Sequence, residues 1–108
     1  MQVIEIVTFK VKNGVSQNEV IEVNKLALAM IEKLDGFMYR SLAFNKESYT
    51  WFDVVYWENA EAAKVGGELF MQSEACKQLM DIVVKESTTM QIGDILYMSE
   101  CTETENYG

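Results

Sequence analysis

The sequence predicts one α+β domain of order β-α-β-β-α-β, the split β-α-β arrangement of ferredoxin-like folds. Three observations predict it. The chain has 108 residues, the size of a single domain. Segments rich in β-branched residues alternate with segments in which apolar residues recur every three or four positions. Helix-capping residues precede the latter segments. Right-handed crossovers then place the first and third strands at the centre of a four-stranded antiparallel sheet, with the helices on one face.

The first strand is predicted over 3–11, where β-branched residues dominate and an Asn-Gly turn signal follows. A capping box comes next, because the Ser16 hydroxyl can accept from a free helix N–H and the Glu19 carboxylate can reach back. Gly36 is suited to end the helix, since glycine tolerates the left-handed conformation. The apolar positions of this helix are Val20, Val23, Ala27, Met30, Ile31 and Leu34.

Segments 37–44 and 49–58 predict the second and third strands, joined as a hairpin by the polar residues 45–48. A loop of two or of four residues gives the same pairing, which places Arg40 opposite Asp53. Opposite charges directly across two strands favour this register. It also sets Leu42 opposite Trp51 and Met38 opposite Val55.

The second helical region is predicted to be kinked or divided in two. Asn59 can cap its start, the glycine pair at 66–67 weakens its middle, and Ser73 can cap a restart. The last strand is predicted over 88–98. The domain therefore spans 1–98, and the acidic tail 99–108 is expected to be loose.

Both faces of the predicted sheet are apolar, which predicts a homodimer. Two helices cover only one face, and an exposed patch with two tryptophans is a liability in water. The tail could fold back instead, but it holds few apolar residues. We therefore expect a second copy to cover one face, with Trp51, Trp57 and the Arg40–Asp53 pair as structural or dimer residues. In the predicted register one face carries Met38, Leu42, Phe44, Trp51, Val55 and Trp57 beside that pair, and the other carries Phe37, Tyr39, Ser41, Ala43, Phe52, Val54 and Tyr56.

The charge and the residue types exclude several classes of function. The net charge of −8 disfavours nucleic acid and anionic membranes as partners. The chain has no histidine, which excludes Ser-His-Asp and Cys-His catalysis and histidine-ligated zinc or haem. Cys76 and Cys101 cannot form a zinc site alone and are expected to be free thiols. No apolar run is long enough to span a membrane, and the N-terminus lacks signal-peptide features, so we expect a cytoplasmic protein without metal or cofactor.

Three stretches of the sequence carry a resemblance: residues 3–14, the Asp35-Gly36-Phe37 entry to the second strand, and residues 51–62. They resemble the antibiotic biosynthesis monooxygenase family of dimeric α+β barrels. In that family the third strand typically ends in tryptophan and a Ser/Asn-x-Glu-Ala run opens the next helix, as Trp57 and residues 59–62 do here. The resemblance covers nearly all of 3–98. It implies two subunits with sheets packed face to face, and either cofactor-free oxygenation of quinols and polyketide phenols or haem degradation.

The resemblance does not extend to the haem-degrading branch. That branch uses an asparagine in the first strand and a tryptophan and a histidine on the second helix. The matching positions here are Val7, Phe70 and Met80, so none of the three residues is retained. Haem degradation is therefore not expected. The polyketide branch places its ligand between the sheet and the helices, and such a cleft is compatible with this sequence.

Glu5 is the candidate catalytic residue, because its face of the first strand is otherwise apolar. Partial desolvation raises the pKa of a carboxyl group toward a value useful for a general base. Such a base could take a proton from a phenol or enol. The other interpretation is structural, with Glu5 paired to a lysine or a tyrosine hydroxyl near the sheet end.

Aromatic and thioether side chains are the candidate ligand-binding residues. They could line an aromatic pocket between sheet and helices, although each could equally be a core residue. Arg40 could likewise grip an anionic substrate rather than only fix the register with Asp53. Asp94 repeats the Glu5 pattern, but Gly93 indicates a bulge that could turn it outward. The alternative to an oxygenase is a non-catalytic ligand-binding or structural homodimer. The substrate-binding candidates are Tyr39, Phe52, Tyr56, Phe70 and Met80.

Overall fold

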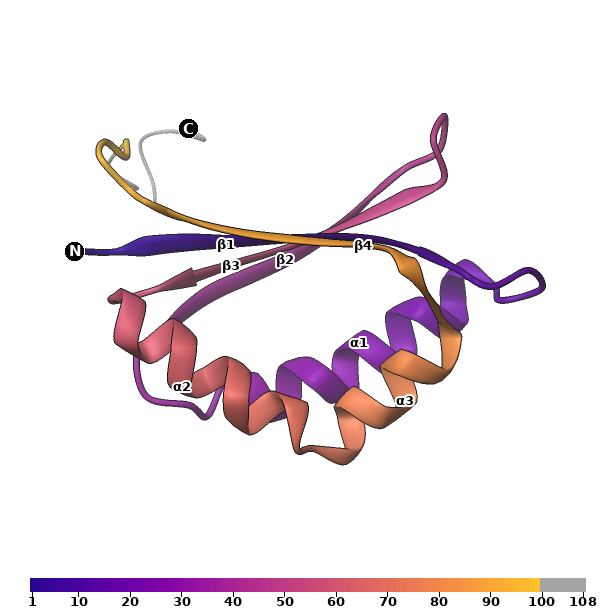
Figure 1. The fold of residues 1–108 in the computed structure, drawn as a ribbon, viewed down its shortest axis with the longest axis horizontal. Helices are drawn as coiled ribbons and strands as arrows, with labels where there is room; N and C mark the ends of the chain where they lie inside the picture. The colour runs from indigo at the N-terminus through magenta and orange to yellow at the C-terminus, as the bar shows by residue number, and fades with distance from the viewer. Residues whose placement is uncertain (100–108) are drawn as a thin grey trace, which may run out of the picture.

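The computed structural model describes residues 1–99 and has the predicted ferredoxin-like fold. The sheet order is β2-β3-β1-β4, and every neighbouring pair is antiparallel. All helices lie on one side of the sheet (Figure 1). The expected loose tail lies outside the described residues, apart from Ser99. The elements are β1 (Val3–Val11), α1 (Gln17–Ile31), β2 (Phe37–Asn45), β3 (Thr50–Trp57), α2 (Ala60–Met71), α3 (Glu74–Ile82) and β4 (Val83–Asp94).

The predicted helix starts are confirmed by their caps. The Ser16 hydroxyl accepts from the Glu19 N–H at 3.1 Å, and the Glu19 carboxylate accepts from the Ser16 N–H at 3.2 Å. Asn59 and Ser73 cap α2 and α3, so the second helical region is two helices. Helix α1 ends at Ile31, before Gly36, which lies at φ +83° in the turn that enters β2. No helix of residues 1–99 is long and apolar enough to cross a membrane.

The hairpin register differs from the prediction by two residues. Arg40 lies opposite Val55, and Asp53 lies opposite Leu42. The prediction was wrong because the loop covers residues 46–49, with Tyr49 in a left-handed conformation at φ +52°. A shift of two keeps every side chain on its face, since strand side chains alternate with period two. Arg40 and Asp53 therefore still meet, as diagonal neighbours.

Strand β4 begins and ends earlier than predicted. Val83 and Val84 precede the predicted strand, but they pair with Val11 and Lys10 of β1. At the other end Asp94 pairs with Val3, the first residue of β1, and β4 ends at Asp94 instead of Met98. The irregularity expected at Gly93 lies elsewhere, between the Thr8 and Lys10 pairings, and Gly93 pairs regularly with Ile4.

The helices cover the tryptophan face of the sheet. Trp51 and Trp57 are buried within a single chain, where they belong to two separate core clusters. Their predicted place at a dimer interface was therefore wrong: the helices, not a second chain, remove this face from water. A bulge at the start of β2 also moves Phe37 to this face, where its ring meets Trp57 edge-on.

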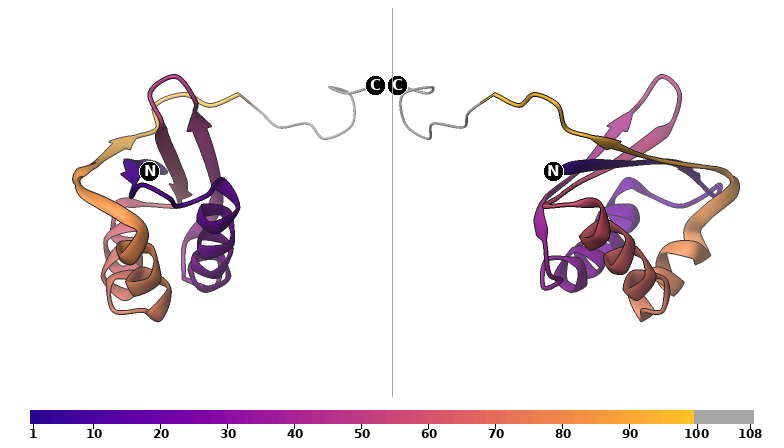
Figure 2. Two further views of the ribbon diagram at one scale, coloured as in Figure 1. Left: turned by 90° about the vertical axis from the view of Figure 1, so that its right-hand side faces the viewer. Right: turned by 60° about the vertical axis from the view of Figure 1, so that its left-hand side comes forward.

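The opposite face of the sheet, here called the open face, has no covering element among residues 1–99 (Figures 1 and 2). Residues directly opposite each other in neighbouring strands have their side chains on the same face of the sheet, so the strand pairing identifies the residues of the open face. Ile6 on this face is 38% exposed, and it lies in the middle of β1. The apolar side chains of the open face are Ile4, Ile6, Tyr39, Ala43, Phe52, Val54 and Tyr56.

Candidate functional site

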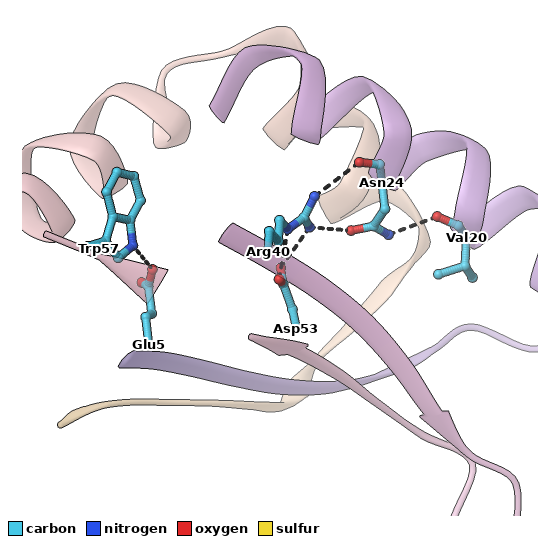
Figure 3. Close-up of polar contacts among 6 residues, drawn as sticks. All are labelled: Glu5, Val20, Asn24, Arg40, Asp53 and Trp57. Carbon is cyan, nitrogen blue, oxygen red and sulfur yellow. Dashed lines mark hydrogen bonds and ion pairs between the residues drawn. The ribbon is translucent and has the colours of Figure 1, made fainter. Parts of the chain in front are cut away.

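A polar cluster lies between the sheet and α1, at the centre of the helix-covered face (Figure 3). Arg40 Nε donates to Asp53 Oδ1 at 2.8 Å, and Arg40 Nη2 donates to Asp53 Oδ2 at 2.8 Å. This is a bidentate pair, the strongest geometry for arginine and carboxylate. The side chains of Arg40 and Asp53 are only 4% and 13% exposed. The pair is therefore buried within one chain and does not lie in a dimer interface.

Asn24 completes the cluster from α1. Its side-chain oxygen accepts from Arg40 Nη2 at 2.6 Å, and its backbone carbonyl accepts from Nη1 at 3.1 Å. Its own Nδ2 donates to the Val20 carbonyl at 2.8 Å. Asn24 is not among the residues predicted from the sequence, although its position on the apolar stripe of α1 could have indicated it. Positions 20, 24, 27 and 31 form the buried stripe of α1, and Asn24 is the one polar residue on it.

Glu5 lies on the same face of the sheet, where it is bound to Trp57. Trp57 Nε1 donates to Glu5 Oε1 at 3.1 Å (Figure 3). Neither a lysine nor a tyrosine hydroxyl pairs with Glu5 among the described residues. The expected structural pairing of Glu5 was therefore wrong in its partner, and the carboxylate points into the layer between sheet and helices.

Burial raises the pKa of the Glu5 carboxyl above its ordinary value of 4.5. The hydrogen bond from Trp57 acts in the opposite sense, because it stabilises the charged form. The nearby Asp53 carboxylate raises the pKa further and the Arg40 guanidinium lowers it. Desolvation is the largest of these effects, so Glu5 holds its proton more tightly in the folded chain than in the unfolded one.

This shift predicts how stability depends on pH. Because the folded state binds the Glu5 proton more tightly, the free energy of unfolding falls as pH rises from 4.5 through the folded-state pKa. Glu5→Gln removes that titration and keeps an oxygen that can accept from Trp57. We expect the unfolding free energy of Glu5→Gln, relative to wild type, to rise between pH 4 and pH 7. Urea unfolding at several pH values measures it, and a difference that does not change with pH would contradict the shift.

Trp57 is held in place by α2 through Gly66. A Cβ on Gly66 would overlap Cη2 of Trp57 and lie 2.9 Å from its Cζ3. The indole is buried and cannot move aside freely. The close approach of α2 therefore sets the orientation in which Trp57 donates to Glu5.

Gly66→Ala is accordingly expected to destabilise the fold by about 1–2 kcal/mol, because overpacking costs more than the gain in helix propensity. Gly67→Ala is the matched control. Nothing lies within 4 Å of a Cβ at this position, so alanine should stabilise the helix by about 0.5–1 kcal/mol. Thermal unfolding of both variants compares them, and equal shifts in Tm would show that Gly66 does not hold the indole.

The approach to Glu5 is open on the side of β4. Ile92 pairs with Glu5, and Met90 pairs with Val7, so both share the helix-covered face. Yet Ile92 is 46% exposed and Met90 is 60% exposed. The helices thus leave the β4 side of this face uncovered, and a small apolar molecule lying there would be next to the Glu5 strand.

The predicted substrate-binding residues do not form one pocket. Tyr39, Phe52 and Tyr56 lie on the open face. Phe70 packs against the core cluster of Trp57 on the other side of the sheet, and Met80 is exposed on α3. The prediction failed because residues from different elements were joined without knowledge of which face the helices cover.

Two concave regions stand out on the surface. A groove of about 480 Å³ lies between α2 and the turn before β2, and it is lined in part by Leu34, Val65 and Leu69. A smaller crevice of about 150 Å³ lies between α1 and β2, beside Asn24 and Arg40. Glu5 lines neither of them.

Metal-ligating and thiol chemistry find little support in residues 1–99. This part of the chain contains no group of three or more His, Cys, Asp or Glu side chains that could hold a metal ion. Cys76 is buried on α3, and burial raises the pKa of its thiol. A buried thiol with a raised pKa is a poor nucleophile. Cys101 lies outside the described residues.

Comparisons with known proteins give matches among solved structures. No family model matches the chain, and no curated protein matches it. A mutant of SnoaB, a cofactor-independent oxygenase from Streptomyces nogalater, matches with a TM-score of 0.75 at 13% identity, over 90% of this chain and 95% of that one. A protein from Bordetella bronchiseptica, described as a candidate antibiotic biosynthesis monooxygenase, matches with a TM-score of 0.73 at 19% identity, over 89% and 98%.

A third structure bears on assembly. A protein of unknown function from Bacteroides fragilis, described as dimeric and ferredoxin-like, matches with a TM-score of 0.60 at 18% identity, over 87% of this chain and 96% of that one. The resemblance seen in the sequence is thereby confirmed at the level of the fold. The chain has the ferredoxin-like fold of the cofactor-independent oxygenase SnoaB and of structures described as antibiotic biosynthesis monooxygenases.

Proposed function

We propose that this protein is a member of the antibiotic biosynthesis monooxygenase family, a homodimer that oxygenates an aromatic, quinol or polyketide-like molecule without a cofactor. The observation that carries the proposal is the Glu5 carboxylate. It lies in the layer between sheet and helices, one oxygen is fixed by Trp57 Nε1 at 3.1 Å, and burial raises its pKa. The fold shared with SnoaB supports the reaction class.

The chemistry requires a base and an electron-rich substrate. Glu5 takes a proton from a ring CH₂ or phenol of the substrate, and a raised pKa suits this transfer near neutral pH. The carbanion carbon then bonds to O₂, the resulting peroxide anion takes the proton back from Glu5, and the hydroperoxide loses water to leave a carbonyl. In total a CH₂ group and O₂ give C=O and H₂O. The substrate supplies all four electrons that O₂ accepts, so no reductant is needed.

Oxygen uptake by the wild-type protein tests this proposal. A panel of anthrones and quinols, with a Clark electrode and product mass spectrometry in ¹⁸O₂, should show one labelled oxygen per product and one O₂ per substrate consumed. Uptake should persist in the presence of a metal chelator. If no member of the panel is oxidised faster than without protein, the proposal fails for this substrate class.

The proposed dimer forms through the open face. A contiguous apolar sheet face is stable in water only when another surface covers it. Ile6 lies in mid-strand on this face, so Ile6→Glu is expected to place two charges in the interface and give monomers. Sedimentation velocity at micromolar concentration measures this. Leu26→Glu, at an exposed position of α1 in the helix layer, is the control that should remain dimeric. A wild-type monomer at this concentration would refute the dimer.

The alternative is a non-catalytic, ligand-binding homodimer, and the position of the larger groove favours it. That groove lies beside α2 and does not include Glu5. In this case ligands would bind with equal affinity to wild type and Glu5→Gln, and no oxygen would be consumed. Binding by calorimetry and oxygen uptake on the same compounds therefore separate the two functions.

A further inference from the structure

The chain beyond β4 carries the most exposed apolar side chains of the described residues. Leu96 is 85% exposed and Tyr97 is 89% exposed, with Met98 also exposed beside them. With Ile95 they form four consecutive apolar residues. Scattered exposed apolar residues are ordinary on a protein surface, but a continuous run of them is typical of a binding segment.

The start of this segment is held against the sheet. The Ile95 N–H donates to the Gln2 carbonyl at 2.9 Å, which continues the β1–β4 ladder by one contact. Beyond it the chain curves toward the side of the sheet opposite to the helices (Figure 1). A second view shows it leaving the body of the domain on that same side (Figure 2). Residues 95–98 therefore project on the same side of the sheet as the open face.

The open face is suited to receive an apolar segment, because its one charged position among the paired residues, Lys10, lies near the end of β1, beyond the stretch from Ile4 to Thr8. The other polar positions carry hydroxyls or amides, and the Thr8 and Thr89 hydroxyls bond to each other. Residues 95–98 are uncharged as well, so a contact with the stretch from Ile4 to Thr8 would bury no unpaired charge. The open-face positions other than the apolar ones are Thr8, Lys10, Ser41, Asn45, Thr50, Thr89, Gln91 and Gly93.

The area of the open face is of the order that a dimer interface needs. Four strands about 4.8 Å apart, with the eight residues of β3 at about 3.3 Å each, give roughly 500 Å² of projected area, and the accessible surface of side chains exceeds the projected area. Stable interfaces bury about 800 Å² per partner. An arm of four apolar residues from each copy would add to the area that two such faces bury.

We propose that residues 95–98 form an arm that packs on the open face of a second copy of this chain. This inference rests on the dimer of the proposed function and goes beyond it, since it names a segment that reaches across. In a two-fold dimer each copy gives one arm and receives one, so the contact is made twice. The arm brings Leu96 and Tyr97 out of water against a face that one chain leaves uncovered.

Two variants test the arm. Leu96→Ser combined with Tyr97→Ser is expected to raise the dimer dissociation constant at least tenfold by sedimentation equilibrium. Leu26→Ser, exposed on α1 in the helix layer, is the matched control and should leave it unchanged. If the double variant dimerises like wild type while Ile6→Glu gives monomers, the sheet-to-sheet dimer stands and the arm is refuted. If wild type is monomeric, the dimer fails with it.

A direct contact measurement does not depend on the variants. In a dimer mixed from ¹³C-labelled and unlabelled copies, filtered NOE spectra should connect the Tyr97 ring of one copy with methyl groups of Ile6 or Val54 of the other. NOEs confined to one copy would show that the segment folds back on its own chain, and would overturn the proposal.

Discussion

Asp53→Ala is expected to lower the free energy of unfolding by about 3–5 kcal/mol, the cost of leaving a buried charge without its partner. Arg40 is 4% exposed, and Asp53 neutralises it through two hydrogen bonds of 2.8 Å. Asn24 cannot replace the carboxylate, since it offers only neutral oxygens. Urea unfolding followed by tryptophan fluorescence measures the change, because Trp51 and Trp57 are buried in the fold.

Two controls test whether the loss of stability comes from leaving a buried charge unpaired or simply from losing an ion pair. The double variant Arg40→Met with Asp53→Leu removes both charges and is expected to lie within about 1 kcal/mol of wild type or above it. Lys25→Ala breaks a surface pair with Glu22, whose side chains are 70% and 69% exposed, and should cost less than about 1 kcal/mol. If Asp53→Ala costs no more than Lys25→Ala, the pair is not the buried bidentate pair that the structure shows.

Glu5→Gln is expected to reduce kcat for the proposed oxygenation by roughly 10²–10⁴-fold, the usual contribution of a general base. KM should change little, since the amide oxygen can still accept from Trp57 Nε1. In wild type, kcat should rise with pH through the folded-state pKa of Glu5, which burial places above 4.5, because the base must be ionised. Steady-state oxygen uptake over pH 4–8 measures both effects.

Glu86→Gln is the matched control for this prediction. Glu86 is an exposed glutamate on β4, so its loss should leave both kcat and the pH profile unchanged. If Glu5→Gln turns over like wild type, Glu5 is not the base. Urea unfolding of Glu5→Gln at the pH of the assay separates a loss of activity from a loss of folded protein.

Local signals in the sequence located the helix starts and the strand order. Ser16, Asn59 and Ser73 marked the caps because a capping side chain bonds within three residues of itself. The pairing partners of β4 depended on distant contacts instead. Val83 and Val84 fit a helix stripe and a strand equally well, and only the presence of β1 beside them decided the matter.

In the candidate site too, some features follow from local signals in the sequence and others depend on distant contacts. Glu5 was identified from the alternation of β1, since a carboxylate among apolar neighbours is visible in the sequence. Its partner was not, because Trp57 lies 52 residues away and reaches Glu5 only after β1 and β3 pair. The Arg40–Asp53 contact was predicted from a register that is off by two, and it survived because a shift of two preserves the face.

The sequence by itself determined the fold class, the helix caps, the apolar character of both sheet faces and Glu5 as an unusual carboxylate. These follow from periodicity and from interactions between residues close in the chain. Only the tertiary structure decided which face the helices cover. Period-two alternation separates two faces without saying which one lies under the helices, so Trp51 and Trp57 were assigned to the interface while Tyr39, Phe52 and Tyr56 were assigned to the cleft. Burial of the tryptophans beneath α1, α2 and α3 reverses both assignments and leaves the face of Ile6 and Tyr56 as the one that the helices do not cover.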